Sequence, residues 1–184
     1  EIGNRSIVGM NMRMNELTGA VALAQSRKLD NILETLRAKK ALLKGILSEG
    51  KGFRFRKIND EGECPTLLTL LFDTKEKAEK FCVKIGGKPI AYSGWHVYNN
   101  MEQILNKVTS SKSNCPYECD KYESEVKYEK HMLPQTDDVL DRAVNISVGV
   151  VDKGLGSGFG ININSSEDEI KEVGKKLLQI INSL

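Results

Sequence analysis

The stretch VGMNMRMNELTGAVALAQSRKL, Val8 to Leu29, decides how this chain is organised. A short Gly/Asn/Arg segment runs directly into apolar and small residues spaced three and four apart, which is the spacing of one helix face. Asn15 is placed to cap this helix, and Glu16 suits its positive first turn. The pattern continues to Leu47 and stops before two glycines. The apolar positions are Leu17, Ala20, Val21, Ala24, Ile32, Leu33, Leu36, Leu43, Ile46 and Leu47.

We therefore predict one long helix over residues 15–49, with Gly50 and Gly52 as its stop. At 1.5 Å per residue, such a helix would be roughly 50 Å long. A small globular domain rarely needs a helix of this length. We expect it to bridge two bodies.

The rest of the chain alternates between short strands and helices. The run 66–72 is apolar throughout, which predicts a central strand buried on both faces. We expect an α+β fold, in which the long helix leads into a small domain with a mainly antiparallel sheet of three to four strands, covered by helices. The other predicted strands are 53–58, 89–92, 143–151 and 159–163, and the other predicted helices are 75–85, 101–108, 136–142 and 166–183.

Composition excludes several classes of function. The net charge is only +2, from 27 basic and 25 acidic residues, so the chain has no electrostatic footprint for nucleic acid or an anionic membrane. No apolar run approaches the ~18 residues of a membrane span. We expect neither nucleic acid nor a membrane as a partner.

The first residues lack the basic and apolar regions of a signal peptide, and they lack an initiator Met. The four cysteines then suggest a reducing compartment with free thiols. We expect a cytoplasmic protein whose sequence begins inside a longer gene product.

Three groups of residues invite a chemical interpretation. The run Gly154 to Gly160 is glycine-rich, but a strand rather than a helix is expected after it, which favours a hairpin over a phosphate loop. Cys115 and Cys119 could hold a metal with His96 and His131, although free thiols are favoured because no second close pair exists. His96 is also the best candidate for a nucleophile pair, against the simpler interpretation of a histidine in a surface loop. We predict no metal site.

The opening motif resembles a known family. Gly9-x-Asn11-x-Arg13-Met14-x-Glu16-Leu17-x-x-Ala20-Val21-Ala22-Leu23-Ala24-Gln25-x-x-Lys28-Leu29-Asp30 closely resembles the segment that follows the catalytic domain in DegT-type sugar aminotransferases, which have the aspartate aminotransferase fold (type I). Leu133-Pro134-x-x-Asp137-x-Val139-Leu140-x-Arg142 resembles the segment before the last helix of the family. Trp95-His96-Val97-Tyr98 falls where the family carries a substrate loop. The resemblance covers most of the chain and is most specific in residues 9–30.

The resemblance implies a pyridoxal 5'-phosphate (PLP) enzyme, homodimeric when intact. Such enzymes convert a keto sugar, often nucleotide-linked, to an amino sugar, with glutamate or glutamine as donor. It also implies three parts: residues 1–14 end a large PLP-binding domain, residues 15–49 form the long helix that connects the two domains, and residues 50–184 form the small C-terminal domain. The family's lysine motif, Ser-x-x-x-Lys, is not found here. We therefore expect no catalytic residue in this chain and no activity from it alone.

The resemblance also assigns site residues. Asn11 corresponds to a contact with the cofactor phosphate of the partner subunit, and Trp95, His96 and Tyr98 to substrate-binding residues. Arg13 corresponds to the motif arginine, which could contact the cofactor phosphate or a substrate carboxylate, or could instead tie the loop down. The Cys115–Cys119 loop and the glycine-rich turn depart from the commonest family pattern, which leaves the sugar open. Two other interpretations stay open at this point: a non-catalytic sensory or binding relative of the same fold, and an unrelated α+β interaction domain.

Overall fold

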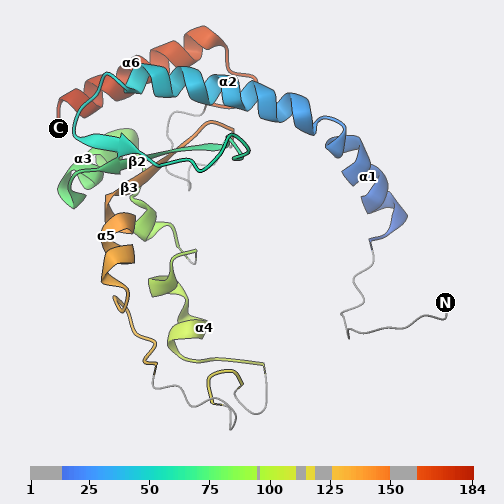
Figure 1. Cartoon of the computed structure of the whole chain (residues 1–184), viewed down its shortest axis with the longest axis vertical. Coiled ribbons are helices and arrows are strands. Elements are labelled where there is room, and N and C mark those ends of the chain that lie inside the picture. The colour runs from blue at the N-terminus through green and yellow to red at the C-terminus, as the bar shows by residue number, and fades with distance from the viewer. Residues whose placement is uncertain (1–13, 95, 111–114, 119–125, 150–160) are drawn as a thin grey trace.

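The computed structural model describes residues 14–94, 96–110, 115–118, 126–149 and 161–184. Within them it contains six α-helices and a three-stranded antiparallel sheet, so the predicted α+β class is confirmed (Figure 1). The helices are α1 (Glu16–Ser26), α2 (Leu29–Leu47), α3 (Lys75–Ile85), α4 (Glu102–Leu105), α5 (Pro134–Arg142) and α6 (Glu167–Asn182), with 3-10 turns η1 (Ile90–Tyr92) and η2 (Tyr98–Asn100). The strands are β1 (Phe53–Phe55), β2 (Leu67–Phe72) and β3 (Ala143–Ser147).

The predicted long helix is two helices. A tight turn at Arg27 and Lys28 separates α1 from α2, and the Lys28 N–H donates to the Gln25 carbonyl at 2.9 Å, a three-residue step. The break lies in a stretch without buried side chains: α1 buries none, and the first buried side chain of α2 is Leu36. Figure 1 shows α1 projecting away from the body at an angle to α2. Asn15 caps α1 as predicted, accepting from the Thr18 N–H at 2.8 Å.

The sheet has the order β1-β2-β3, with β2 in the centre as predicted. Leu70 of β2 lies opposite Phe55 on one side and Val144 on the other. However, β2 is not buried on both faces. Its even-numbered side chains are buried and its odd-numbered side chains are half-buried, because helices pack closely on one face only.

The core lies between this face and three helices. Leu43 and Leu47 of α2, Phe81 of α3, and Leu177 of α6 are all fully buried and pack in one cluster with β2. In Figure 1, α2 and α6 run side by side along the sheet. The predicted capping box of α6, Ser166 with Glu169, is present, with reciprocal hydrogen bonds of 2.6 and 3.2 Å.

Two predicted strands are wrong within the described residues. Residues 89–92 form the 3-10 turn η1, which is closed by a 3.0 Å hydrogen bond from the Tyr92 N–H to the Pro89 carbonyl. Proline has no N–H to give to a strand, and a turn needs none from it. Residues 161–163 are not a strand either, and 159–160 lie outside the described residues. So does the glycine-rich run 154–160.

The other predicted helices and strands are present, although β1 covers only 53–55 of the predicted 53–58 and α4 only 102–105 of the predicted 101–108. Helix α3 covers the predicted residues and ends at Gly86, whose φ of +67° favours glycine. Strand β3 is shorter than predicted, ending at Ser147. In the part of the chain that the structure describes, no helix is both long enough and apolar enough to cross a membrane.

A buried ion-pair cluster holds the loop after β1 against α2. The Lys40 ammonium is buried and ion-paired with the Glu63 carboxylate, which also accepts from Arg56. Burial alone would raise the pKa of Glu63, but the hydrogen bonds and charges of Lys40 and Arg56 together outweigh it and lower that pKa. Lys40 would be left buried without a counter-charge if Glu63 were neutral.

We predict that Glu63→Gln lowers the free energy of unfolding by about 1–3 kcal/mol at pH 7, because it leaves the buried Lys40 charge without its partner. A carboxyl with a lowered pKa stabilises the folded state above its unfolded pKa, and this contribution is lost as the pH falls through the folded value. The difference from wild type should therefore shrink below pH 4.5. Urea unfolding across pH measures it. Glu61→Gln, at an exposed position in the same loop, is the matched control, and an equal loss there would contradict the prediction.

Helices α2 and α6 approach closely at a glycine. A Cβ added to Gly174 would lie 2.9 Å from Cδ1 and 3.2 Å from Cβ of Ile46. We predict that Gly174→Leu costs roughly 1–3 kcal/mol of stability through overpacking. Gly45→Leu, where nothing lies within 4 Å, should be neutral or stabilising because leucine is the better helix former. Thermal unfolding of both variants tests this pair, and equal losses would show that the close approach is unimportant.

Candidate functional site

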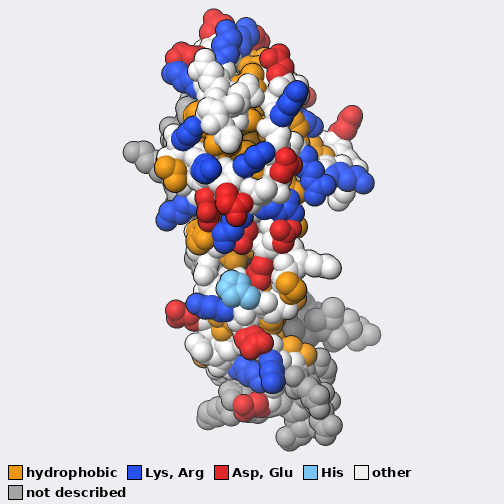
Figure 2. Space-filling view, turned by 90° about the vertical axis from the view of Figure 1, so that its left-hand side faces the viewer, with side chains coloured by type: hydrophobic (Ala, Val, Ile, Leu, Met, Phe, Trp, Pro, Cys, Tyr) orange, Lys and Arg blue, Asp and Glu red, His pale blue; other side chains and the backbone are white. Residues whose placement is uncertain are grey.

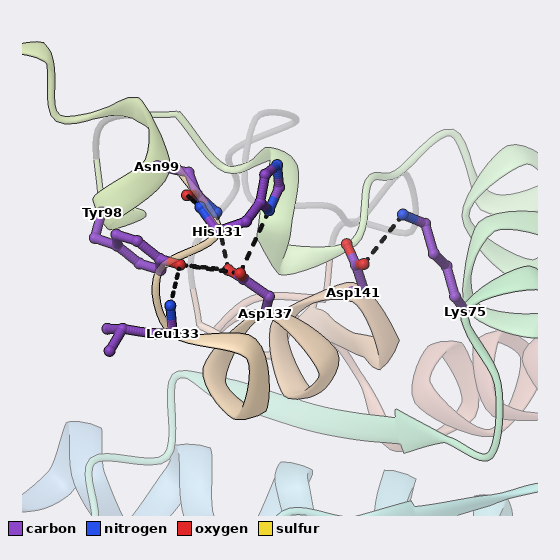
Figure 3. Close-up of polar contacts among 7 residues, drawn as sticks. All are labelled: Lys75, Tyr98, Asn99, His131, Leu133, Asp137 and Asp141. Carbon is purple, nitrogen blue, oxygen red and sulfur yellow. Dashed lines mark hydrogen bonds and ion pairs between the residues drawn. The ribbon is translucent and has the colours of Figure 1, made fainter. Parts of the chain in front are cut away.

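The Asp137 carboxylate is the centre of a polar cluster that joins three segments of the chain (Figure 3). It accepts from the Tyr98 hydroxyl at 2.9 Å and from the Asn99 amide at 2.9 Å, and it lies 3.3 Å from Nδ1 of His131. Its side chain is only 15% exposed. A carboxylate has enough acceptor positions for all three groups, so one acidic side chain ties η2 and the segment before α5 to the helix itself.

The backbone completes the cluster. The Leu133 N–H donates to the Tyr98 oxygen at 3.0 Å, and the His131 N–H donates to the Asn99 side chain at 2.8 Å. His131 has a φ of +64°, in the left-handed region that few non-glycine residues adopt. Burial, together with the Asp137 carboxylate, raises the pKa of the Tyr98 hydroxyl. The hydroxyl therefore stays protonated and donates to Asp137.

Two further contacts fix α5, the helix that carries Asp137. The Arg142 guanidinium donates to the Phe72 carbonyl at the end of β2 at 3.0 Å, and it also pairs with Asp138. The hydrogen bonds from Arg142 lower the pKa of the Asp138 carboxyl. Lys75, at the start of α3, pairs with Asp141 at 3.0 Å. The sheet and α3 thus set the position of the cluster.

A small hollow of about 200 Å³ opens beside the cluster. Its lining mixes amide, carboxylate, ammonium, imidazole and phenol groups, which suits a ligand with many hydroxyls more than an apolar ligand or a strongly charged one. Figure 2 shows a histidine side chain at the surface among Lys, Arg, Asp and Glu side chains, with both charge signs interspersed. The polar lining residues include Tyr92, Asn99, Asn100, Lys130, His131 and Asp141.

The structure describes two of the five site residues named from the sequence. Tyr98 is half-buried, with its hydroxyl bonded to Asp137 and Leu133, and His96 is exposed. Asn11, Arg13 and Trp95 lie outside the described residues. Tyr98 therefore holds the loop by its hydroxyl, and neither Tyr98 nor His96 is among the residues that line the hollow.

Sequence reasoning missed the residues that organise this site. The sequence places Asp137 in the family motif without a role, gives no signal for Asn99, and offers His131 only as a possible metal ligand. The local signal for Asp137 is its place in the first turn of α5, which begins at Pro134. Nothing local in the sequence pairs it with residues almost 40 positions away.

Two lysines, Lys75 and Lys130, line the hollow. The hydrogen bond from Lys75 to Asp141 raises the pKa of the Lys75 ammonium, which disfavours covalent binding of PLP by this residue, because a lysine that binds PLP must give up its proton. Among the described residues, no three His, Cys, Asp or Glu side chains group as metal ligands, and Cys119 lies outside them. Cys82 is a core thiol whose pKa burial raises to about 12.

We predict that Asp137→Asn loosens the loop without unfolding the domain. The new amide nitrogen would face the donors of Asn99 and His131 in place of an acceptor. Hydrogen exchange at the His131 and Leu133 amides should speed up roughly tenfold, while amides of β2 stay protected. Glu129→Gln, which removes one exposed charge from the segment just before His131, is the matched control. Unchanged exchange in Asp137→Asn would show that the carboxylate does not hold the loop.

Comparison with known proteins assigns most of this arrangement to a family. The model of the DegT/DnrJ/EryC1/StrS aminotransferase family matches residues 3–151 of the 184. The match spans the helix pair, β1 and β2, α3, the Asp137 cluster and β3. The chain belongs to the DegT/DnrJ/EryC1/StrS aminotransferase family.

Proposed function

We propose that this chain is the small-domain portion of a PLP-dependent aminotransferase that converts a keto sugar to an amino sugar. The observation that carries the proposal is the family match over residues 3–151, which includes the Asp137 cluster and its polar hollow. PLP, when bound, carries an amino group from a donor amino acid to the sugar carbonyl. We propose glutamate or glutamine as that donor, a nucleotide-linked sugar as the acceptor, and a cytoplasmic location.

The chemistry of the hollow supports a sugar. Amide and carboxylate groups bind vicinal hydroxyls by giving and accepting hydrogen bonds, and Asn99, Asn100 and Asp141 all line the hollow. Tyr92 is 52% exposed at its edge and offers a flat apolar ring. We propose that His96, Trp95 and the ring of Tyr98 contact the sugar from the same loop.

Helix α1 supports a larger assembly. Leu17, Val21 and Leu23 are 77%, 54% and 56% exposed, and α1 buries no side chain in the described chain. Large apolar side chains on several sides of one helix are usually covered by another body. We propose that this body is a large PLP-binding domain that ends in residues 1–14, with the α1–α2 pair as the connection and residues 50–184 as the small domain.

In this arrangement the enzyme is a homodimer, and Asn11 and Arg13 reach the cofactor phosphate of the partner subunit. An amide or a guanidinium can donate hydrogen bonds to phosphate oxygens. The chain of 184 residues should then be inactive alone, because the lysine that holds PLP belongs to the large domain.

The test uses the protein extended upstream by its own coding sequence. It should bind PLP, as an absorbance band shows, and should form amino sugar from keto sugar and glutamate or glutamine. The 184-residue chain should do neither. If the extended protein binds no PLP and stays monomeric, the proposal is wrong. If it binds PLP and dimerises but transfers no amino group to any keto sugar, a non-catalytic relative is the better description.

We predict that Asn11→Ala in the extended protein weakens PLP retention roughly tenfold, the scale of one lost hydrogen bond to a charged phosphate. Dialysis followed by cofactor absorbance measures it, and unchanged circular dichroism would show that the fold is intact. Asn164→Ala, beyond the family match in the turn before α6, is the matched control. Full cofactor retention in Asn11→Ala would rule out the phosphate contact.

A further inference from the structure

Residues 94 and 96–101, which we call the site loop, form a compact turn that holds its own shape. The Val97 N–H donates to the Gly94 carbonyl at 3.1 Å, and the Asn100 N–H donates to the Val97 carbonyl at 2.8 Å. The Asn100 side chain also donates to the Gly94 carbonyl at 3.0 Å. Gly94 has a φ of +83°, which a glycine adopts readily. All of these bonds lie within the site loop, so a change at Asp137 leaves them intact.

Two kinds of contact join the site loop to the rest of the domain. The Tyr98 hydroxyl and the Asn99 amide both donate to Asp137 at 2.9 Å, and Figure 3 shows the two side chains converging on this one carboxylate. Val97 adds an apolar contact, because its side chain is buried. The burial of an apolar side chain has no preferred direction, whereas hydrogen bonds do. Val97 therefore keeps the loop attached, and Asp137 sets its orientation.

Asp137 has a fixed position from which to do this. Helix α5, which carries it, is tied to the end of β2 by the hydrogen bond from Arg142 to the Phe72 carbonyl. The ion pair of Lys75 with Asp141 ties the same helix to α3. Because the Asp137 side chain is only 15% exposed, little water competes for its hydrogen bonds. The packed sheet thus sets the orientation of the site loop through one carboxylate.

The site loop supplies part of the wall of the hollow beside Asp137. Asn99 and Asn100 line this hollow from the loop, and His131 lines it from the segment before α5. The His131 N–H donates to the Asn99 side-chain oxygen at 2.8 Å, which couples His131 to the loop. A rotation of the site loop would therefore change the distances between its polar groups and those that line the hollow from elsewhere. The latter are Tyr92, Lys75, Lys130 and Asp141.

A ligand with several hydroxyls is sensitive to such a change. Each hydroxyl needs a partner at hydrogen-bond distance, and a displacement of about 1 Å can cost a large factor in rate. A donor amino acid such as glutamate has carboxylates and an amine but no hydroxyl, so the amides of the hollow contribute less to its binding. This distinction rests on the proposed function, in which the hollow receives the keto sugar.

We propose that Asp137 is a positioning residue for the sugar half of the aminotransferase reaction. It acts through the hydroxyl of Tyr98 and the amide of Asn99, and it sets the geometry in which Asn99, Asn100 and His131 meet the sugar. The donor half of the reaction depends on it much less. Asp137 is therefore a residue that selects between the two substrates without belonging to the catalytic groups.

Hydrogen exchange in the 184-residue chain tests the positioning step without cofactor or activity. In Asp137→Asn, the Val97 and Asn100 amides should keep their protection within about twofold, because their bonds lie inside the site loop. The Leu133 amide, which bonds Tyr98, should exchange roughly tenfold faster. Equal acceleration at all three amides would mean that the loop unfolds, and no acceleration at Leu133 would mean that Asp137 does not hold it. Either result overturns the proposal.

Separate measurement of the two half-reactions in the extended protein tests the selectivity. Keto acid released from glutamate in the absence of sugar reports the donor half. The kcat/KM for keto sugars, free and linked to uridine or thymidine diphosphate, reports the sugar half. Asp137→Asn should lower kcat/KM for the sugar about tenfold or more, chiefly through KM, with an effect on the donor half at least about fivefold smaller. Equal losses in the two halves, or an unchanged sugar half, would contradict the proposal.

Tyr98→Phe distinguishes positioning from direct contact with the sugar, because it removes only the hydroxyl that bonds Asp137. It should lower kcat/KM for the sugar at least about threefold, and the double variant should lose no more than Asp137→Asn alone, because both changes break one contact. Losses that multiply would mean that Asp137 touches the sugar directly, which overturns the positioning role. Asp168→Asn, at an exposed position of α6 outside the lining of the hollow, is the matched control and should change neither half.

Failure of this proposal is distinguishable from failure of the proposed function. A wild-type extended protein that neither releases keto acid from glutamate nor aminates a sugar would overturn the function, and the exchange measurement would still report on the loop. Wild-type turnover of both substrates, with equal losses in Asp137→Asn, would leave the function standing and remove the positioning role.

Discussion

The burial of Leu68, Leu70 and Phe72 under α2, α3 and α6 is the contact on which the rest of this structure depends. A strand has two faces, and residues that alternate along it cannot both enter one core. Once the even-numbered residues of β2 are buried, its odd-numbered residues must face the other way. That second face carries Arg54 of β1, Arg56 just after it, and the Thr69–Asn145 pair. The buried core and the second, half-exposed face of the sheet are therefore two consequences of the same packing arrangement.

Helix α5 links the packed sheet to the polar cluster around Asp137. It is held to the end of β2 by Arg142 and to the start of α3 by Lys75 and Asp141. Asp137 then presents its carboxylate to the segment that contains Tyr98 and Asn99. η2 is a single 3-10 turn, and residues 126–133 form neither helix nor strand. Polar contacts, and not a packed core, therefore hold these segments in place. A polar hollow beside such a loop is well suited to hydroxyl-rich ligands.

Local patterns predicted much of the fold. Helix α3, the capping box of α6, and β2 as the central strand follow from periodicity, caps and apolar runs, because each is set by neighbouring residues. The family was also recognisable, because its motif in residues 9–30 is nearly continuous. The errors have tertiary causes. The predicted long helix breaks at Arg27, in a stretch that buries no side chain against the domain. Residues 89–92 close a turn beside α5 and form no strand.

The site divides in the same way. The sequence by itself determined the family, the central strand and several of the helices, and the loop in which His96 and Tyr98 lie, since these depend on motifs and on residues near one another in the chain. Only the tertiary structure decided that the Tyr98 hydroxyl donates to Asp137, that His131 lies beside the same carboxylate, and that Arg54 and Asn145 line one hollow over the sheet. Those contacts join residues between 6 and more than 90 positions apart, across strands and loops whose register depends on how the core packs. No local pattern encodes that register, because it is a property of the packed sheet as a whole.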